Sequence, residues 1–531
     1  MSSANQIGYK ASTFTRFTDV GTYLDASRVS VSSPLYNFTA QFPGGSLVVG
    51  SNTIALNPVP PGVNGSDGQH YLYISGGLGT AEAVLITGGT AVSDSSSGTV
   101  SFTCANTHSG AWSISSASGG IKEASVSNPS GTIYIPAGTI NIRATLVLPT
   151  TVSLIGQGAS TANPVTMGTI LSCSASANPA LVLADGSGSA AGQGIGYHSG
   201  YTLVSPGGTG SGLWLGGDPS NVFAPSAWFG SYIHFESVVT NFVTGITVAN
   251  GNFVVFSGGA SNSITTALYI PSTNDGSQPL EFSNFLLSVS EGGNAVVMDW
   301  SGFVTCMVHF AGGQISGTIT GAQVSWDSEG THYEPNGAGR IVNISANGSH
   351  RFRASGGLMS VHGTGTLDAM VKVSGTGIYE VNLSDILIQA DVGHTVTDFV
   401  SFTSSSGGTL IISGIEIQPA GTISRLYSTS GQLGLYVMHS KYSVTQGVTA
   451  AATTVFPESN YPTRGLIEIQ GATVGGGGIT AVSGLINGQT GILYSDNVQT
   501  FTAGATIGFT LTTVANAVYT YNFHSNVFWI K

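Results

Sequence analysis

Charged side chains are scarce in this chain: Lys and Arg number 13, and Asp and Glu number 25, among 531 residues. They make up 7% of the sequence, against about 25% in an ordinary globular domain. The 76 glycines follow no every-third-residue period, which excludes a collagen-like chain. Because 41% of the residues are hydrophobic, the sequence is also unlike a disordered one. We expect a folded protein with a large core and a neutral, polar surface.

Basic residues are too few for a nucleic-acid partner, because phosphate binding needs clustered Lys and Arg and the net charge is −12. Long apolar runs are also missing. The runs present are far shorter than the about 20 residues that span a bilayer, so we expect no membrane insertion.

The three cysteines are widely spaced and odd in number: they are Cys104, Cys173 and Cys306. This pattern predicts buried free thiols, no metal site and no cofactor.

The shortage of charge has a physical explanation in stacked β-structure. Equivalent positions on neighbouring strands lie about 4.8 Å apart, so repeated like charges would repel one another. Ladders of Ser, Thr and Asn avoid that repulsion. Helix-favouring Glu, Lys and Arg are used sparingly. The composition therefore predicts an all-β protein built from stacked strands.

Four regions of the chain differ in composition and in the pattern of apolar and turn-forming residues. Residues 1–30 are polar and suit an N-terminal arm or attachment segment, whereas residues 31–118 suit a small β-rich module of short strands and turns. Residues 119–440 are expected to form a right-handed parallel β-helix, a solenoid. Residues 445–531 suit a C-terminal β-rich cap, or a receptor-binding or trimerisation module. No strict repeat is found, so a run of independent β-sandwiches is the competing interpretation.

The stretch from Ser130 to Gly158 has the clearest pattern. Aliphatic residues recur two apart in four short runs, which places each pair on one face of a strand. The pairs are Ile133 with Ile135, Ile140 with Ile142, Leu146 with Leu148, and Val152 with Leu154. Pro136-Ala-Gly and Leu148-Pro-Thr provide corners between the runs. Four short strands with tight corners would form the first rungs of a β-helix.

This segment resembles the opening of the pectate-lyase-like β-helix family, whose first rung reads roughly G-G-T-V-Y-L-P-x-G-T. The resemblance implies that fold for the region that follows, and a short helix at Ile121-Lys-Glu-Ala before the first rung. The family includes secreted polysaccharide-degrading enzymes and phage tailspikes, so the fold alone does not define the function. The terminal modules, and an N-terminus without the basic and apolar stretches of a secretory signal, are more similar to a tailspike. That resemblance implies a homotrimer, a polysaccharide partner and attachment to a larger particle through the N-terminal segment.

The sequence departs from the catalytic motifs of the family's enzymes. Polygalacturonases carry an Asp-Asp pair, a Gly-His-Gly and an Arg-x-Lys, whereas this sequence has no Asp-Asp and only Val361-His-Gly echoes the second motif. Calcium-dependent pectate lyases need an acidic cluster near a catalytic Arg. Arg351-Phe-Arg353 has no such cluster beside it in the sequence. Neither chemistry can therefore be carried over to this chain.

The densest group of acidic residues is Asp327, Glu329 and Glu334. If Trp326 points inward, Asp327 and Glu329 point outward, with Cα atoms about 6.6 Å apart. Side-chain movement from there reaches the carboxyl separations that glycosidases use. One carboxyl would protonate the leaving oxygen while another acts as nucleophile or activates water, and Glu334 is the alternative acid. The competing interpretation is that these residues only solvate a turn between rungs.

Aromatic and imidazole groups near these acids are the expected substrate-binding residues, because flat rings stack on sugar faces. They are His332, Tyr333 and Trp300, and the further tryptophans Trp214 and Trp228 could serve in the same way. Packing in the core is the competing interpretation for each ring. Two weaker candidate sites are Asp299 with Trp300 and His309, and the stretches Tyr379–Asp385 and Asp391–His394.

The leading hypothesis is a tailspike-like receptor-binding protein that recognises, and could depolymerise, a bacterial surface polysaccharide. Its expected location is extracellular or on a virion surface. One alternative is a secreted polysaccharide lyase or glycoside hydrolase. Another is a structural or adhesion β-helix rod without catalytic activity.

Overall fold

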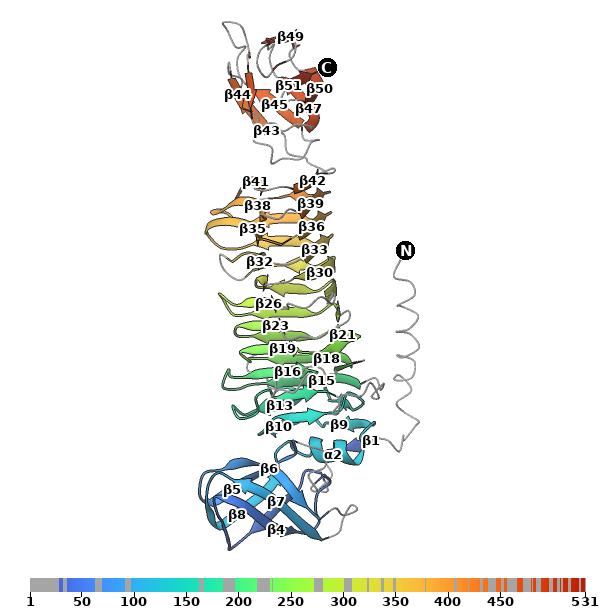
Figure 1. Ribbon diagram of the computed structural model, residues 1–531, viewed down its shortest axis with the longest axis vertical. Helices are drawn as coiled ribbons and strands as arrows, with labels where there is room; N and C mark the ends of the chain where they lie inside the picture. The colour runs from blue at the N-terminus through green and yellow to red at the C-terminus, as the bar shows by residue number, and fades with distance from the viewer. Residues whose placement is uncertain are drawn as a thin grey trace.

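The chain forms an elongated β-rod with a small sheet module at its N-terminal end, as the computed structural model shows (Figure 1). Among the described residues, no helix is long and apolar enough to cross a membrane. The described residues are 28–31, 36–62, 69–90, 97–161, 167–184, 196–216, 230–231, 233–271, 280–299, 308–321, 324–335, 339–346, 350–377, 379–404, 408–418, 420–429 and 433–437, together with strands and short stretches between 446 and 530.

The N-terminal module is an antiparallel sheet in the order β2-β8-β5-β6-β7-β4, with β3 paired to β8. Alternating residues of its strands bury an apolar core that includes Leu72, Ile74, Phe102 and Trp112. This alternation is the sign of a strand with one buried face. The strands are β2 (Thr39–Phe42), β3 (Ser46–Leu47), β4 (Gly50–Leu56), β5 (Tyr71–Leu78), β6 (Glu82–Gly89), β7 (Gly98–Cys104) and β8 (His108–Ser116).

The long region that follows is a parallel β-helix, which confirms the predicted all-β solenoid. Each rung runs through up to three strands, and each strand pairs in parallel with its counterpart in the next rung. The first ladder consists of β9 (Thr132–Tyr134), β12 (Ser153–Ile155), β15 (Gly196–Val204), β18 (Ile233–Thr240), β21 (Val254–Ser257), β24 (Leu280–Ser283), β27 (Val308–Ala311), β30 (Ser325–Glu329), β33 (His350–Ser355), β36 (Tyr379–Ser384), β39 (Gly408–Ser413) and β42 (Leu433–Val437).

Two further ladders complete the rungs. The second ladder consists of β10 (Gly138–Ile142), β13 (Thr169–Cys173), the later parts of β15 and β18, β22 (Ala260–Ser263), β25 (Leu286–Val289), β28 (Gln314–Ser316), β31 (His332–Tyr333), β34 (Leu358–Val361), β37 (Leu387–Ala390) and β40 (Glu416–Ile417). The third, an 11-stranded sheet, consists of β11 (Leu146–Leu148), β14 (Leu181–Leu183), β16 (Ser211–Leu215), β19 (Thr244–Val248), β23 (Thr266–Ile270), β26 (Asn294–Met298), β29 (Ile319–Gly321), β32 (Val342–Ala346), β35 (Gly365–Gly375), β38 (His394–Ser404) and β41 (Thr422–Thr429).

The first rungs have the predicted strands. Runs of aliphatic residues form β9, β10, β11 and β12, and their inward side chains join the main core. Ile140 is the exception among the predicted pairs, because it is only partly buried and packs on the edge of that core. Helix α2 (Ile121–Ser127) precedes the first rung and buries Ile121 and Ala124 against it. Strand β1 (Arg28–Ser30) pairs with β9 and closes the same end.

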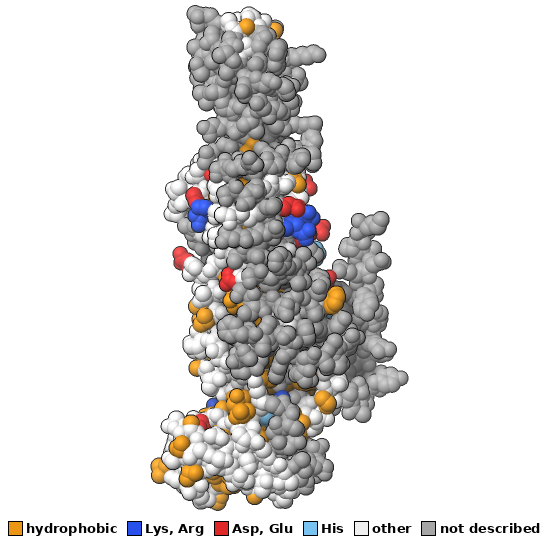
Figure 2. Space-filling model, in the orientation of Figure 1, with side chains coloured by type: hydrophobic (Ala, Val, Ile, Leu, Met, Phe, Trp, Pro, Cys, Tyr) orange, Lys and Arg blue, Asp and Glu red, His pale blue; other side chains and the backbone are white. Residues whose placement is uncertain are grey.

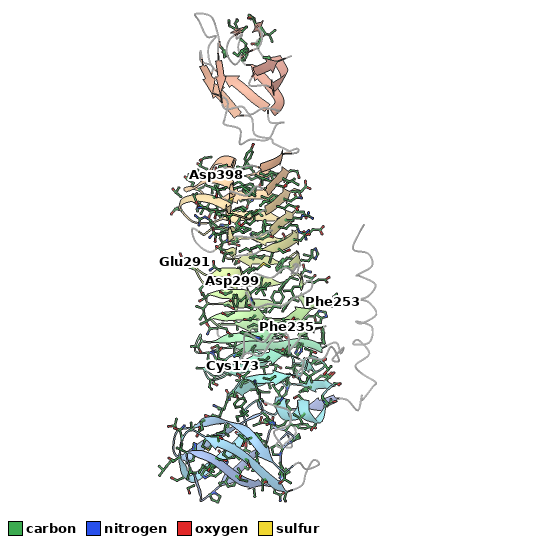
Figure 3. The ribbon with its side chains drawn as sticks, in the orientation of Figure 1. Cys173, Phe235, Phe253, Glu291, Asp299 and Asp398 are labelled. Carbon is green, nitrogen blue, oxygen red and sulfur yellow. The ribbon has the colours of Figure 1, made fainter. Side chains whose placement is uncertain are left out.

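A stack of aromatic rings fills the middle of the solenoid. Phe256 and Phe282 lie in register on β21 and β24, with ring centroids 4.5 Å apart. Phe310 continues the stack at 5.4 Å, and Trp326 follows at 5.7 Å. Phe235 lies at the other end of this column, on β18 (Figure 3). Each such ring pair contributes about 0.5–1.5 kcal/mol beyond its burial, so the stack stabilises the rungs that carry Asp327 and its neighbours.

Left-handed residues form the sharp corner between the first and second ladders. At the corners from Gly258 to Asp385 the amide of the left-handed residue donates a hydrogen bond to a carbonyl of the next rung, for example from Gly330 to Ser355 at 2.9 Å. The stacked corners keep the outward side chains of both ladders close to one edge of the rod. The corner residues with positive φ are Gly258, Asn284, Gly312, Gly330, Gly356, Asp385 and Gly414.

Strands at the C-terminal end belong to separate small sheets. The largest has the order β43-β45-β47-β50-β51, with strands β43 (Gln446–Thr449), β45 (Leu466–Gln470), β47 (Gln489–Ser495), β50 (Ala517–His524) and β51 (Val527–Ile530). Two-stranded sheets there pair β44 (Thr453–Val455) with β46 (Ala481–Ser483), and β48 (Thr500–Phe501) with β49 (Leu511–Thr512). A further two-stranded sheet, β17 (Gly230–Ser231) with β20 (Gly251–Asn252), belongs to the solenoid region.

Candidate active site

Charged residues gather in the later rungs of the solenoid. Figure 2 shows acidic and basic side chains concentrated at one level of the rod, well above the N-terminal module. Two ion-paired groups lie there: Arg353 with Glu380 at 2.6 Å, and Arg340 with Asp368 at 2.6 Å. In a chain with so few charges, this part of the rod holds an unusual concentration of ionisable side chains, and we therefore look for the active site there.

The outward face of the first ladder carries a row of ionisable side chains. His309 on β27 lies in register with Asp327 on β30, and Asp327 lies in register with Arg353 on β33. Neighbouring strands are about 4.8 Å apart, so these side chains are adjacent along the rod. The row combines an imidazole, a carboxylate and a guanidinium, which are groups able to transfer protons and to bind anionic or hydroxylated sugars.

Asp327 and Glu329 point outward, as the alternation of β30 predicts. Trp326 is fully buried, whereas Asp327 is partly exposed and Glu329 is exposed at the strand end. Among the described residues, neither carboxylate forms an ion pair. Both groups are therefore accessible to a ligand that lies along the rod.

Around the corner, on the second ladder, Glu334 lies at the centre of a hydrogen-bonded cluster. Its Oε1 atom is 3.2 Å from Nε2 of His362, and its Oε2 atom accepts a 2.9 Å hydrogen bond from Nε2 of Gln314. Nε2 of His332 lies 3.7 Å from Oε2. On the far side of His362, Nδ1 is 3.2 Å from Oδ2 of Asp391. We call these five residues the Glu334 cluster.

Successive rungs build this cluster. Gln314 comes from β28, His332 and Glu334 from β31 and the residue after it, His362 from the residue after β34, and Asp391 from the residue after β37. Gln314 lies in register with His332, and the β34–β37 register, continued one residue past Val361 and Ala390, brings His362 beside Asp391. The side chains of Glu334, His362 and Asp391 remain 32%, 42% and 49% exposed, so solvent and a ligand can reach them.

Two hydrogen-bond partners favour the ionised form of Asp391. The amide of Gly363 donates a 3.0 Å hydrogen bond to Oδ2 of Asp391 and, with His362, holds the pKa of Asp391 below its usual value. Asp391 therefore stays ionised. Only a doubly protonated His362 ring can donate to both Glu334 and Asp391, because the neutral ring has a single N–H.

The imidazole of His362 separates the two carboxylates of the cluster. It has a 3.2 Å contact with Glu334 on one side and with Asp391 on the other. The cluster therefore links two carboxylates through one ring that can carry a proton on either nitrogen.

Ser360 lies beneath the cluster and forms a triad-like arrangement with His362 and Asp391. Its Oγ atom is 3.1 Å from Nε2 of His362 and 3.2 Å from Nε2 of His332. Ser360 is only 1% exposed, however, and Glu334 contacts the same nitrogen of His362. The serine therefore orients the two imidazoles through hydrogen bonds, and it is too buried to attack a substrate carbonyl.

The structure corrects the role expected for Tyr333. Its ring is 1% exposed and lies in the core, where its hydroxyl accepts a 3.0 Å hydrogen bond from Nε1 of Trp326 and contacts Oγ of Ser328. The corner at Gly330 resets the in–out alternation, so His332 faces outward and Tyr333 inward. Tyr333 cannot present a ring face to a sugar, whereas His332 is placed to do so.

The remaining candidates are dispersed. Trp300 and Trp228 lie outside the described residues. Asp299 follows β26 on the third ladder (Figure 3), and so lies on a different sheet from His309. Trp214 packs on Val182 on the outward side of the third ladder.

The residues of the third candidate region, Tyr379–Asp385 and Asp391–His394, do not form one site. Glu380 pairs with Arg353, Asp385 occupies a left-handed corner, and His394 is buried. Of this region, only Asp391 joins the Glu334 cluster.

His362 was visible in the sequence only as the partial motif Val361-His-Gly. Its contacts with Glu334 and Asp391 depend on a rung length of 28 to 29 residues, which no sequence repeat revealed.

Together, fold and site define a parallel β-helix protein with a carboxylate–imidazole cluster on its solvent face. No protein family and no curated protein matches the sequence. Among solved structures, it is similar to the catalytic unit of a thermostable GH87 α-1,3-glucanase from Streptomyces thermodiastaticus strain HF3-3. The identity is 12%, the match covers 74% of this chain and 89% of that chain, and the TM-score is 0.32. A likeness this weak says nothing about activity.

Proposed function

We propose that this chain is a tailspike-like protein that binds a bacterial surface polysaccharide along its rod and hydrolyses it at the Glu334 cluster. The observation that carries the proposal is the half-exposed chain of contacts from Glu334 through His362 to Asp391. It is a set of proton-transferring groups on a surface otherwise poor in charge.

The proposal gives the two carboxylates different roles. Asp391 stays ionised, because the Gly363 amide and His362 lower its pKa, and so it suits activation of water. Glu334 is the acid that protonates the leaving oxygen. Gln314 and His362 fix its carboxylate from two sides, which lowers the cost of orienting it during the reaction.

The shape of the surface favours a polymer as the substrate. Solenoids present long binding surfaces, and here Asp327, Glu329 and His309 continue the polar face across neighbouring rungs. Ser355 lies in register with Glu329 on the next strand, and its hydroxyl can exchange hydrogen bonds with sugar hydroxyls. Asp327 and Glu329 are therefore proposed as sugar-binding residues, with a second acid–base role as the alternative.

A specific observation also favours a lyase as the second candidate. His309, Asp327 and Arg353 lie in register on three successive strands, so a base and a cation lie on one face of the rod, two rungs apart, as the two groups that β-elimination of a uronate requires. Arg353 would neutralise the sugar carboxylate and His309 would abstract the proton. A purely structural rod is the third possibility, in which the polar groups only satisfy one another.

The test is an assay of the purified chain on a panel of bacterial capsular and O-antigen polysaccharides. New reducing ends without absorbance at about 235 nm, where the unsaturated uronates of lyases absorb, support hydrolysis at Glu334. New reducing ends with that absorbance support the His309 and Arg353 alternative. Binding without cleavage across the panel would support the structural rod and contradict the proposed enzyme.

The assembly and location form a separate part of the proposal. We place the chain in a homotrimer that is attached to a larger particle, on a virion surface or otherwise outside the cell, through its N-terminal segment. Light scattering tests the oligomer directly: a trimer has about three times the chain mass of 53.9 kDa. A monomer at micromolar concentration would contradict it.

A further inference from the structure

The N-terminal module holds a second group of reactive side chains, far from the Glu334 cluster. Glu82 begins β6, Cys104 ends β7 and His108 begins β8, and one ligand-type atom from each lies within 4.8 Å of the other two. We propose that these three side chains bind a divalent transition-metal ion of the Zn²⁺ type.

The donor set matches such an ion. Zn²⁺ binds thiolate, imidazole and carboxylate at about 2.0–2.3 Å, which requires donor atoms that are already gathered within a few ångströms. Softer sulfur and nitrogen ligands favour Zn²⁺ over Mg²⁺ or Ca²⁺, which prefer oxygen. Three protein ligands leave the fourth tetrahedral position for water or an external group.

The fold holds the ligands in place. Oε2 of Glu82 accepts a 2.8 Å hydrogen bond from the amide of Ala105, and Oε1 accepts a 2.9 Å bond from the amide of Asn106. Oε1 also lies 2.8 Å from Nε2 of His108. The β7–β8 turn, which carries two ligands, is thereby fixed to the third ligand before any ion binds. Such outer contacts orient metal ligands and raise affinity.

Charge balance favours the same conclusion. Cys104 and His108 are each 1% exposed, so an ion with net charge would be costly to bury. One thiolate and one carboxylate neutralise a divalent cation, and the imidazole is neutral when it coordinates. The resulting site carries no net charge, which is what a buried position requires.

One polar atom among these ligands has no partner in the described part of the protein. Nδ1 of His108 is buried and has no hydrogen-bond partner, a situation that is uncommon in folded proteins and that an ion or a functional role often explains. The imidazole therefore offers a second nitrogen for coordination besides Nε2, which contacts Glu82.

This metal site could not be predicted from the sequence. Cys104 and His108 are four residues apart, but Glu82 precedes Cys104 by 22 positions and reaches it only through the pairing of β6 with β7. The spacing of the cysteines alone therefore predicted no metal. The proposal is independent of the polysaccharide site, because the residues belong to different sheets and share no contacts.

The test uses the full-length chain without an affinity tag, reduced and freed of metal with a chelator, and then titrated with Co²⁺. We expect saturation at one ion per chain, with thiolate-to-cobalt absorption and the visible bands of a tetrahedral site, and displacement by Zn²⁺. Cys104→Ser removes the thiolate band, and His108→Gln and Glu82→Gln weaken binding at least tenfold. Cys173→Ala, which removes a buried thiol from the solenoid, is the matched control and keeps the band.

A second readout separates metal loss from misfolding. Zn²⁺ should raise the melting temperature of the wild-type chain and of Cys173→Ala, but not that of Cys104→Ser, whose metal-free melting temperature stays close to the wild-type value. The proposal is overturned if the wild type gives no thiolate band, if the band survives Cys104→Ser, or if Zn²⁺ leaves the wild-type melting temperature unchanged.

Discussion

Nδ1 of His362 lies 3.2 Å from Oδ2 of Asp391, one rung further along the solenoid, while Nε2 of the same ring contacts Glu334 on the rung before. One imidazole thus links two carboxylates, and the three side chains come from three successive turns of the chain. The solenoid converts a separation of nearly 30 residues into direct contact, and this is how a sequence without a compact catalytic motif can assemble a site.

Replacing Asp391 with Asn tests the base. The amide keeps the size of the side chain but cannot take up a proton, so cleavage should fall by about 10²- to 10⁴-fold, the usual contribution of general acid–base catalysis. Initial rates of reducing-end formation measure the loss. Asp368→Asn, on the third ladder, is the matched control, because it alters an equally exposed carboxylate on a different sheet. Equal losses in the two variants would contradict a catalytic role for Asp391.

Tyr333→Phe tests the corrected role of this residue. The variant loses the hydrogen bonds to Trp326 and Ser328 inside the core and leaves buried polar atoms unpaired, at a cost of about 1–3 kcal/mol. Glycan affinity should not change, because the ring does not reach the surface. Denaturant unfolding and a binding titration measure the two effects. Weaker binding with unchanged stability would place the ring in the binding site instead.

Glu236 predicts how stability depends on pH. Burial alone would raise its pKa, but hydrogen bonds from His234, Tyr197 and Ser257 together outweigh burial and lower the pKa to about 2. An ionised Glu236 therefore stabilises the fold above its unfolded-state pKa of about 4.3, and this contribution disappears as the pH falls towards 2.

The comparison is between the wild type and Glu236→Gln, melted at several pH values from 7 to about 3. Their melting temperatures should differ most near neutral pH and converge in acid. Glu329→Gln serves as the control, since its carboxylate is exposed on the same ladder and should show little difference at any pH. A gap for Glu236→Gln that widens in acid would contradict the assignment.

The junction between the N-terminal module and the solenoid depends on Glu123 of helix α2. This carboxylate is fully buried and lies 3.2 Å from Nε2 of His70, and it accepts hydrogen bonds from Ser116 at 2.8 Å and Ser118 at 3.2 Å. Glu123→Ala removes the buried carboxylate that these three groups share, which should cost about 3–5 kcal/mol. Urea unfolding measures the loss. The exposed Glu291→Ala should stay within about 0.5 kcal/mol of the wild type, and similar losses in both variants would rule out a special role for Glu123.

The sequence predicted those features that depend on neighbours along the chain. Pairs such as Ile133 with Ile135 specified the first strands, because alternation within one strand is a local property. The same reasoning placed Trp326 inside and Asp327 outside. The expectation that Tyr333 binds sugar was wrong, since its ring lies in the core beyond the left-handed corner at Gly330, which was the competing interpretation.

The features that could not be predicted depend on the length of the rungs. Glu334 was identified as a candidate acid, but its partners His362 and Asp391 lie one and two rungs away. Divergent rungs leave no counted repeat, so nothing in the sequence indicated which residues stack. The Cys104 site was hidden for a similar reason, because strand pairing rather than spacing brings Glu82 to it.

The most direct test of hydrolysis at the Glu334 cluster compares the rates of glycan cleavage by Glu334→Gln and Asp368→Asn on a polysaccharide that the wild-type chain degrades. Cleavage by Glu334→Gln should fall by at least about 100-fold, while binding persists and Asp368→Asn remains active. Wild-type cleavage by Glu334→Gln would contradict it and would place the chemistry elsewhere on the rod.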